Sequence, residues 1–193
     1  MAKTDKKAAT ARSAAVEVLQ QVLGEGAYTN IAVNKYLRSH ELSDMDRRLM
    51  TELVYGTVKA VGTIDWYLQQ CVTRPLDKID KLVLSILRIS VYQLLYMDKI
   101  PASAACNEAV NLARLFSHEG TAKFVNGVLR GLLRKKDSFT FPDAEKETAD
   151  YISLTMYHPR WLVKKWLKNY GRAETEALCA FDNNPAPVCL RVN

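Results

Sequence analysis

The run Leu82–Met97 is the sequence feature that most limits how this chain can fold. It is apolar on most faces of a helix. Its main apolar residues are Leu82, Val83, Ile86, Leu87, Val91, Leu94 and Leu95. A helix that is apolar all round has to be covered by other elements. Arg88 interrupts the run, which is too short to span a bilayer, so we expect the central buried helix of an all-α fold and no membrane contact.

Residues Asn107–Lys136 predict two further helices joined by a short break. Apolar side chains recur in both at the three-and-four spacing of a buried stripe. Ser117–Gly120 ends the first helix, and Thr121 is a suitable N-cap for the second. No stretch of the chain shows sustained strand alternation, which supports the all-α class.

The outward face of the second of these helices is predicted to be basic. Lys123, Gly127, Arg130 and Arg134 are offset by four, seven and eleven residues and form one helical stripe. A mid-helix glycine costs about 1 kcal/mol relative to alanine, so Gly127 and the neighbouring Gly131 need a reason. Close approach of another backbone or of a phosphate would supply one. A solvated basic face with glycines admitted for helix packing is the equally weighted alternative.

Charge is unevenly distributed along the chain. The 193 residues carry 27 Lys and Arg against 21 Asp and Glu, a net charge of +6, which suggests a polyanionic partner. Basic residues gather in Met1–Arg12, Lys123–Lys136 and Arg160–Arg172, and acidic residues gather in Asp137–Asp150. Segregation of this kind favours charged patches over a mixed surface.

The sequence shows no catalytic, cofactor or metal motif. The four cysteines and three histidines are scattered, without zinc spacing or the density of a disulfide scaffold. Gly24-x-Gly26 follows a predicted helix and not a strand, so it is not a nucleotide-binding turn. We therefore expect no catalytic residue, cofactor or metal in this chain. The N-terminus lacks an apolar signal segment, so we expect a cytoplasmic location.

The character of the sequence changes after Lys136. The polar segment that follows is predicted to be a linker, and His158-Pro159 introduces a helix over Arg160–Tyr170. Trp161 lies among lysines on one side of that helix. It could stack on a base, but we favour a half-buried position at a core edge flanked by snorkelling lysines. At the end, Val188, Leu190 and Val192 alternate as in a strand without a partner, as if opening a further module.

A resemblance to the NusB family of all-helical RNA-binding factors is carried by Asn107-Glu-Ala-Val110 and by Lys123-Phe-Val-Asn-Gly-Val-Leu129. Other stretches resemble the N-terminal domain of bacterial small-subunit ribosomal RNA cytosine-5 methyltransferases. They are Thr51-Glu-Leu-Val-Tyr-Gly-Thr57, Arg74-Pro-Leu-Asp-Lys-Ile79, Leu87–Tyr96, Ile100-Pro-Ala-Ser-Ala and the tail from His158. Arg130 favours this branch, because free-standing antitermination factors usually carry an acidic residue there.

This resemblance implies a NusB-like helical bundle of two packed helical subdomains. It implies an RNA-binding domain at 1–136, a linker at 137–157, and at 158–193 a helical extension that starts the methyltransferase's N-terminal subdomain. In that family the catalytic region binds S-adenosylmethionine and attacks the pyrimidine with a cysteine thiolate. Neither part is in this chain, so the cofactor is expected only for an absent catalytic domain.

The implied function is to hold small-subunit ribosomal RNA for that C-terminal methyltransferase domain. The residues expected to bind RNA are Lys3, Lys6, Lys7, Arg12, Lys123, Asn126, Arg130 and Arg134. The cations would contact phosphates, and Asn126 would donate to a phosphate or a base edge. For Asn126 the alternative is an amide that ties a neighbouring helix end.

Two other functions are compatible with the sequence. One is a stand-alone antitermination factor, which would bind RNA and a ribosomal protein. The other is a helical adaptor that binds only proteins, with basic faces that serve solubility. Salt-dependent RNA binding separates the adaptor from the two RNA-binding functions.

Overall fold

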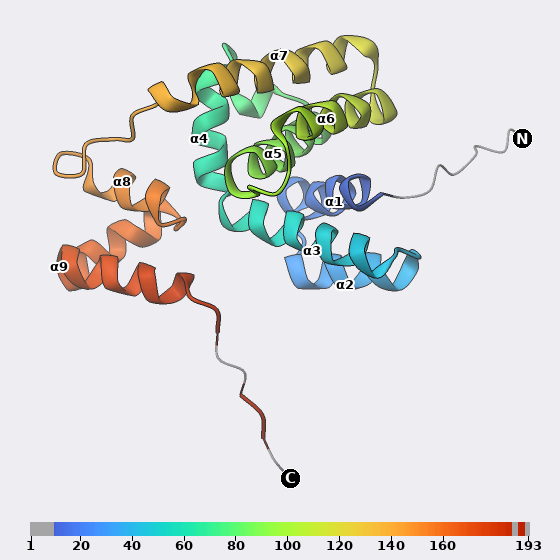
Figure 1. Ribbon diagram of the computed structural model, residues 1–193. Coiled ribbons are helices and arrows are strands. Elements are labelled where there is room, and N and C mark those ends of the chain that lie inside the picture. Colours follow the sequence, from blue (N-terminus) through green and yellow to red (C-terminus); the bar gives the residue numbers. More distant parts are fainter. Residues whose placement is uncertain (1–9, 187–188, 192–193) are drawn as a thin grey trace, which may run out of the picture. The chain divides into compact units, whose positions relative to one another are not determined.

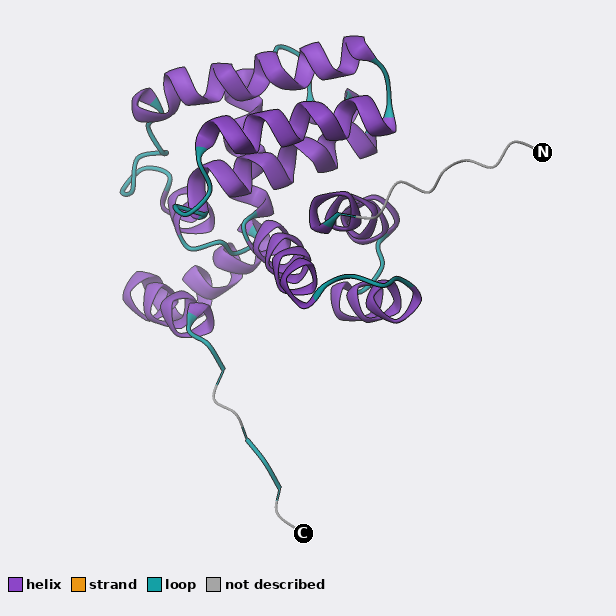
Figure 2. Ribbon diagram, turned by 45° about the vertical axis from the view of Figure 1, so that its right-hand side comes forward, coloured by secondary structure: helices purple, strands orange, loops and turns teal. Residues whose placement is uncertain are grey.

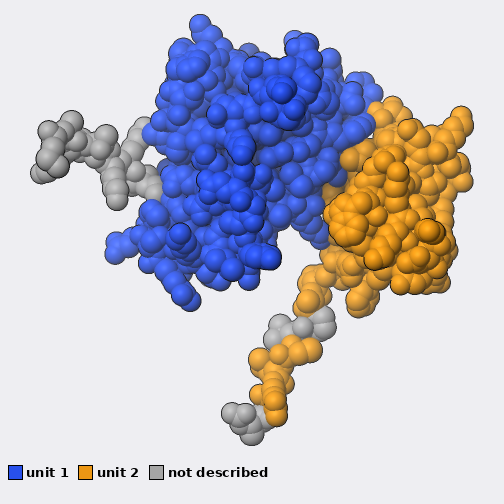
Figure 3. Space-filling model, turned by 180° about the vertical axis from the view of Figure 1, so that it is seen from behind, with its two compact units in different colours: residues 1–139 blue, residues 140–193 orange. Residues whose placement is uncertain are grey.

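The computed structural model describes residues 10–186 and 189–191, and every regular element in those ranges is a helix. The predicted all-α class is therefore confirmed. The chain divides into two compact units, residues 1–139 and 140–193, coloured blue and orange in Figure 3. Within the described ranges, no helix has the length and apolar character needed to cross a membrane.

The first unit is a bundle of α-helices joined by short turns. Its α-helices are α1 (Ala11–Leu19), α2 (Thr29–Ser39), α3 (Asp44–Lys59), α4 (Val61–Cys71), α5 (Lys81–Tyr96), α6 (Ala102–Phe116) and α7 (Glu119–Lys135). Three short turns are the π-helical η1 (Gln20–Gly24) and the 3-10 turns η2 (Leu76–Lys78) and η3 (Lys136–Ser138). Helices α1–α3 pack on one another, α4, α6 and α7 pack against α5, and α5 contacts both groups (Figures 1 and 2). This is the expected pair of packed subdomains.

Helix α5 is the centre of this unit, as the sequence predicts. It contacts α1, α3, α4, α6 and α7. Its residues Ile86, Leu87 and Ile89 are completely shielded from solvent. Burial of each such side chain contributes about 1.5–3 kcal/mol. Asp80 caps the helix, because its Oδ1 accepts hydrogen bonds from two backbone N–H groups of the first turn, at 3.0 and 3.1 Å.

Two polar residues of α5, Arg88 and Tyr92, bind to neighbouring helices. Arg88 donates two hydrogen bonds, of 2.8 and 2.7 Å, to the carboxylate of Asp65 on α4. Tyr92 Oη donates to Glu52 Oε1 on α3 at 2.6 Å. Paired bonds between a guanidinium and a carboxylate fix orientation as well as charge. The interruption of the apolar run at Arg88 therefore orients α4 against α5.

The cap of α7 lies three residues earlier than predicted. The helix begins at Glu119, and its N-cap is His118 instead of Thr121. His118 Nδ1 accepts a long hydrogen bond, 3.4 Å, from the backbone N–H of Thr121. Histidine is not a preferred N-cap residue, so the sequence pattern pointed to the next hydroxyl side chain instead.

The second unit contains α8 (Thr148–Thr155) and α9 (Arg160–Asn183), which pack on each other. The core between them is formed by Ile152, Val163 and Cys179. Helix α9 is kinked at Gly171, which has φ of 76°, a conformation that glycine adopts without steric cost. The predicted helix Arg160–Tyr170 is the first arm of α9.

The boundary between the two units lies after residue 139, close to the predicted domain end at Lys136. The segment 137–157, expected as a linker, is shared between the units. Phe139 packs edge-on against Trp66 and Tyr67 of the first unit, and α8 belongs to the second. Of the predicted terminal strand, Leu190 is 85% exposed in irregular structure, and Val188 and Val192 lie outside the described residues.

We predict that Gly56→Ala destabilises the protein. A Cβ at Gly56 would lie 2.1 Å from the ring of Tyr92, which is only 8% exposed and is held by its bond to Glu52. We expect the free energy of unfolding, measured by urea denaturation, to fall by about 1–3 kcal/mol.

The matched control is Gly62→Ala in α4, where nothing lies within 4 Å of an added Cβ. Its unfolding free energy should stay unchanged or rise by up to about 1 kcal/mol. A Gly56→Ala protein as stable as this control would contradict the close packing of α3 on α5.

Candidate nucleic-acid interface

Helix α7 has one buried face and one solvent face, as predicted. Val125, Leu129 and Leu132 are completely buried, against neighbours in α4, α5 and α6. The predicted stripe of Lys123, Gly127, Arg130 and Arg134 lies on the exposed side. Because the buried face fixes the rotation of the helix, the basic stripe has to point to solvent.

The stripe cations are not neutralised by neighbouring acids. Among the described residues, Lys123, Arg130 and Arg134 form no ion pair within 4.0 Å. The one carboxylate in the first turn, Glu119, accepts a hydrogen bond from Arg114 Nε at 2.8 Å. This bond lowers the pKa of Glu119, with smaller help from the charges of Arg114 and Lys123. The stripe therefore presents positive charge beyond the first turn.

Two of the glycines of α7, Gly127 and Gly131, have open space beside them. A Cβ built at Gly127 or Gly131 meets no described atom within 4 Å. Helix packing within the described chain therefore does not explain either glycine. Of the explanations that the sequence offered for these glycines, close approach of a partner's backbone or of a phosphate remains.

A hollow of about 690 Å³ adjoins the N-terminal end of α7. It is lined in part by Arg74, Lys78, Gly120 and Phe124. The guanidinium carbon of Arg74 lies 4.8 Å from the centre of the Phe124 ring, a cation–π contact. Sequence reasoning missed Arg74 and Lys78 as candidates, although both belong to the motif Arg74–Ile79, because only the fold brings them to α7.

The remaining predicted residues are placed differently. Lys3, Lys6 and Lys7 lie outside the described residues. Arg12 is half-buried, and its Nε donates to Gln93 Oε1 at 2.7 Å, so it ties α1 to α5. Asn126 is half-buried, and its amide makes no hydrogen bond to a described residue. The alternative in which Asn126 ties a neighbouring helix end is therefore not what the described structure shows.

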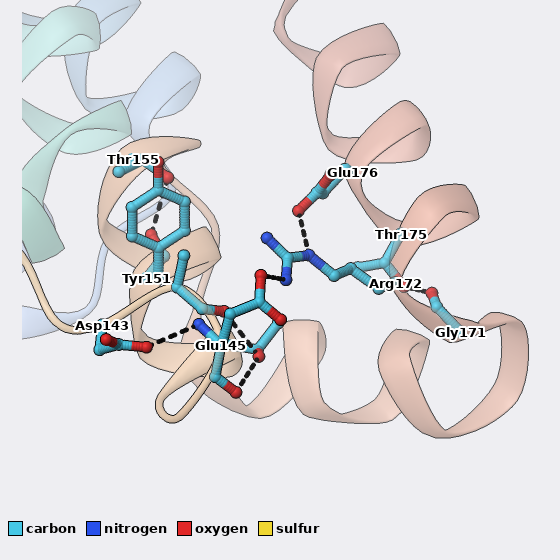
Figure 4. A network of polar contacts seen from close by, with 10 residues as sticks. Asp143, Glu145, Tyr151, Thr155, Gly171, Arg172, Thr175 and Glu176 are labelled. Carbon is cyan, nitrogen blue, oxygen red and sulfur yellow. Dashed lines mark hydrogen bonds and ion pairs between the residues drawn. The ribbon is translucent and has the colours of Figure 1, made fainter.

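The second basic cluster, in α9, is partly neutralised within its own unit. Arg160 makes a two-pronged contact with Asp150, and this hydrogen bonding lowers the pKa of Asp150. Arg172 donates to Glu145 at 2.6 Å and to Glu176 at 2.8 Å (Figure 4). Acidic residues that looked like a separate patch in the sequence are thus partners of the α9 arginines.

The described residues include no group of His, Cys, Asp or Glu side chains arranged to hold a metal ion. The four cysteines are free thiols. Burial raises the pKa of Cys71, Cys106 and Cys179. A raised pKa leaves little of the reactive thiolate near neutral pH.

Two family models match the chain. The model of the NusB family matches residues 9–134, which include all four residues of the α7 stripe. A model described as a methyltransferase RsmF/B-like, ferredoxin-like domain matches residues 158–193, which include α9.

Named relatives agree with both models. A probable ribosomal RNA small subunit methyltransferase B of Bacillus subtilis is 39% identical over 188 residues, 97% of this chain. A protein of the same name from Synechocystis sp. is 38% identical over 187 residues, 95% of this chain. The chain spans 41% of the length of each. A crystal structure of the antitermination factors NusB and NusE with double-stranded RNA has a similar fold, with a TM-score of 0.58 at 21% identity, covering 64% of this chain and 93% of that one.

We predict that Arg12→Ala lowers stability whether or not RNA is present. The substitution removes the donor to Gln93 Oε1, and Gln93 is only 2% exposed. Loss of a partner for a buried polar group costs about 1–3 kcal/mol, which a urea titration can measure. Arg134→Ala, exposed and without an ion pair to described residues, should change the unfolding free energy by less than about 0.5 kcal/mol. Equal stability of the two variants would mean that Arg12 is an ordinary surface cation.

Proposed function

Because the chain belongs to the NusB family, we propose that its helical bundle binds ribosomal RNA through the exposed face of α7. Lys123, Arg130 and Arg134 contact phosphates, and Asn126 donates to a phosphate or a base edge. The observation that carries this proposal is a row of cations without acidic partners among the described residues, on a helix whose opposite face is buried.

The wider proposal concerns the whole protein. The relatives named as ribosomal RNA small subunit methyltransferase B support a role in an S-adenosylmethionine-dependent cytosine-5 methyltransferase of the bacterial cytoplasm. In this role the α7 surface holds small-subunit ribosomal RNA for a catalytic domain that lies outside this chain. That domain binds S-adenosylmethionine and performs the methyl transfer.

The second candidate is a stand-alone antitermination factor that binds RNA together with a ribosomal protein. The similar fold of the NusB–NusE–RNA structure favours it. Arg130 and the match of residues 158–193 to a methyltransferase-associated domain favour the methyltransferase. Methyl transfer to small-subunit ribosomal RNA by the whole protein, reduced by Arg130→Glu/Arg134→Glu, would decide between them.

We predict that RNA binding by this chain is salt-dependent and needs the α7 stripe. The logarithm of the affinity, measured by fluorescence anisotropy with ribosomal RNA fragments, should fall linearly with the logarithm of the salt concentration. Arg130→Glu/Arg134→Glu should lower the affinity at low salt by ~10-fold or more. It should also flatten the slope by about 0.7–0.9 for each phosphate that is no longer neutralised.

The matched control is Arg47→Glu/Arg48→Glu on α3. Both arginines are exposed, and the change in net charge is the same. This variant should keep the wild-type salt slope. Equal losses of RNA affinity in both variants would mean that only the net charge of the chain matters for binding. An absence of RNA binding by the wild type at low salt would exclude the RNA-binding function.

We also predict that Gly127→Ala separates stability from binding. An alanine has room in the free protein and a better helix propensity, so the unfolding free energy should rise by up to about 1 kcal/mol. RNA affinity should fall, because the added methyl group occupies the space that the RNA backbone approaches. Gly62→Ala should leave RNA affinity unchanged. Wild-type affinity in Gly127→Ala would leave the glycine without a role in binding.

A further inference from the structure

Trp161 on α9 is exposed, against the expectation that it lies half-buried at a core edge. Its exposed fraction is 69%. The other tryptophan of the helix, Trp166, packs against the core formed by Ile152, Val163 and Cys179. The ring of Trp166 also lies 5.5 Å from the ring of His158. Since Trp166 already fills the inward side, the second unit does not need Trp161 for its packing.

Three lysines follow Trp161 along the exposed side of the same helix. Lys164, Lys165 and Lys168 follow it by three, four and seven residues, so all lie within about 60° of it around the helix axis. All three are exposed. They form no ion pair within the described chain, whereas Arg160 and Arg172 of the same helix are both paired with acids. We call these four residues, Trp161, Lys164, Lys165 and Lys168, the α9 face.

The α9 face combines the two features by which proteins hold single-stranded nucleic acid. An exposed aromatic ring stacks on an unpaired base, and the flanking cations follow the phosphates. The stripe on α7 itself carries no aromatic residue, and the nearby ring of Phe124 is half-buried with the guanidinium of Arg74 over one of its faces. The two surfaces therefore suit different parts of an RNA.

We propose that the α9 face is a second RNA-binding surface, which holds an unpaired segment by stacking a base on Trp161 while its lysines contact the adjoining phosphates. This inference rests on the proposed RNA-binding function and adds a site and a substrate class to it: single-stranded RNA. Charge complementarity argues for RNA over an apolar protein partner, since one aromatic ring among three cations offers little apolar area to bury.

The test compares variants of the full chain on two RNA probes, a single-stranded oligoribonucleotide without self-complementarity and a hairpin duplex. Trp161→Ala should lower affinity for the single strand by about 10-fold, because base stacking on one aromatic ring is removed. Trp161→Phe should retain most of it. Lys165→Gln/Lys168→Gln should flatten the single-strand salt slope by about 0.7 for each phosphate that is no longer neutralised. Binding of the single strand should quench tryptophan emission in the wild type and not in Trp161→Phe.

Phe181→Ala is the matched control. Phe181 is 72% exposed on the same helix but is followed by Asp182 and has no lysine close in sequence. It should bind both probes like the wild type. Circular dichroism should show unchanged helix content in every variant, because each altered side chain is exposed.

The outcomes separate this inference from the proposed function. If Trp161→Ala and the lysine variant bind the single strand like the wild type, while Arg130→Glu/Arg134→Glu loses hairpin binding, the α9 face is not an RNA surface and the α7 proposal stands. If no variant changes binding to either probe, both proposals fail. Loss of single-strand affinity in Phe181→Ala as large as in Trp161→Ala would also overturn the assignment, since stacking would not depend on the lysines.

Discussion

The burial of α5 is the constraint on which the rest of the first unit depends. Five helices contact it, and each of them gives one face to it or to its neighbours and leaves another face to solvent. For α7 this division is sharp, with Val125, Leu129 and Leu132 completely buried and the basic stripe opposite them. A rotation that hid the cations would expose three large apolar side chains, at about 1.5–3 kcal/mol each. Packing therefore determines where the positive charge is presented.

The pairing of charges determines where positive potential remains on the surface, which the net charge of the chain does not show. Several arginines are paired with carboxylates, as Arg88 is with Asp65 and Arg172 is with Glu145 and Glu176. The more exposed of these pairs, such as Arg172 with Glu145, contribute no more than about 1 kcal/mol to stability. Their larger effect is to cancel positive potential where they lie. Positive potential then remains at the basic positions without acidic partners, which among the described residues include those on α7 and on the first arm of α9.

The sequence predicted the features that follow from local periodicity. The central position of α5 and the outward direction of the α7 stripe are both encoded in the spacing of apolar residues within one helix. The environments of Arg12 and Trp161 were predicted less well, because the residues that determine them are not given by the periodicity of a single helix. The acceptor of Arg12, Gln93, lies 81 residues along the chain. For α9, the sequence pattern favoured Trp161 at a core edge. In the fold Trp166 packs against the core of the second unit instead, and Trp161 is exposed.

If the α7 stripe and the α9 face both bind RNA, one RNA that reaches both surfaces binds more strongly than it would to either alone, even if one of them is weak. Once the α7 stripe holds an RNA, a single-stranded segment of the same molecule meets the α9 face at an effective concentration set by the connecting chains, in the millimolar range for short flexible ones. A site with a dissociation constant near 1 mM, about 4 kcal/mol of binding free energy, would then be substantially occupied. Such a chain would prefer RNA in which paired and unpaired segments adjoin over either kind alone. The preference would come from the geometry of the RNA and would require no direct reading of base sequence by the α7 stripe.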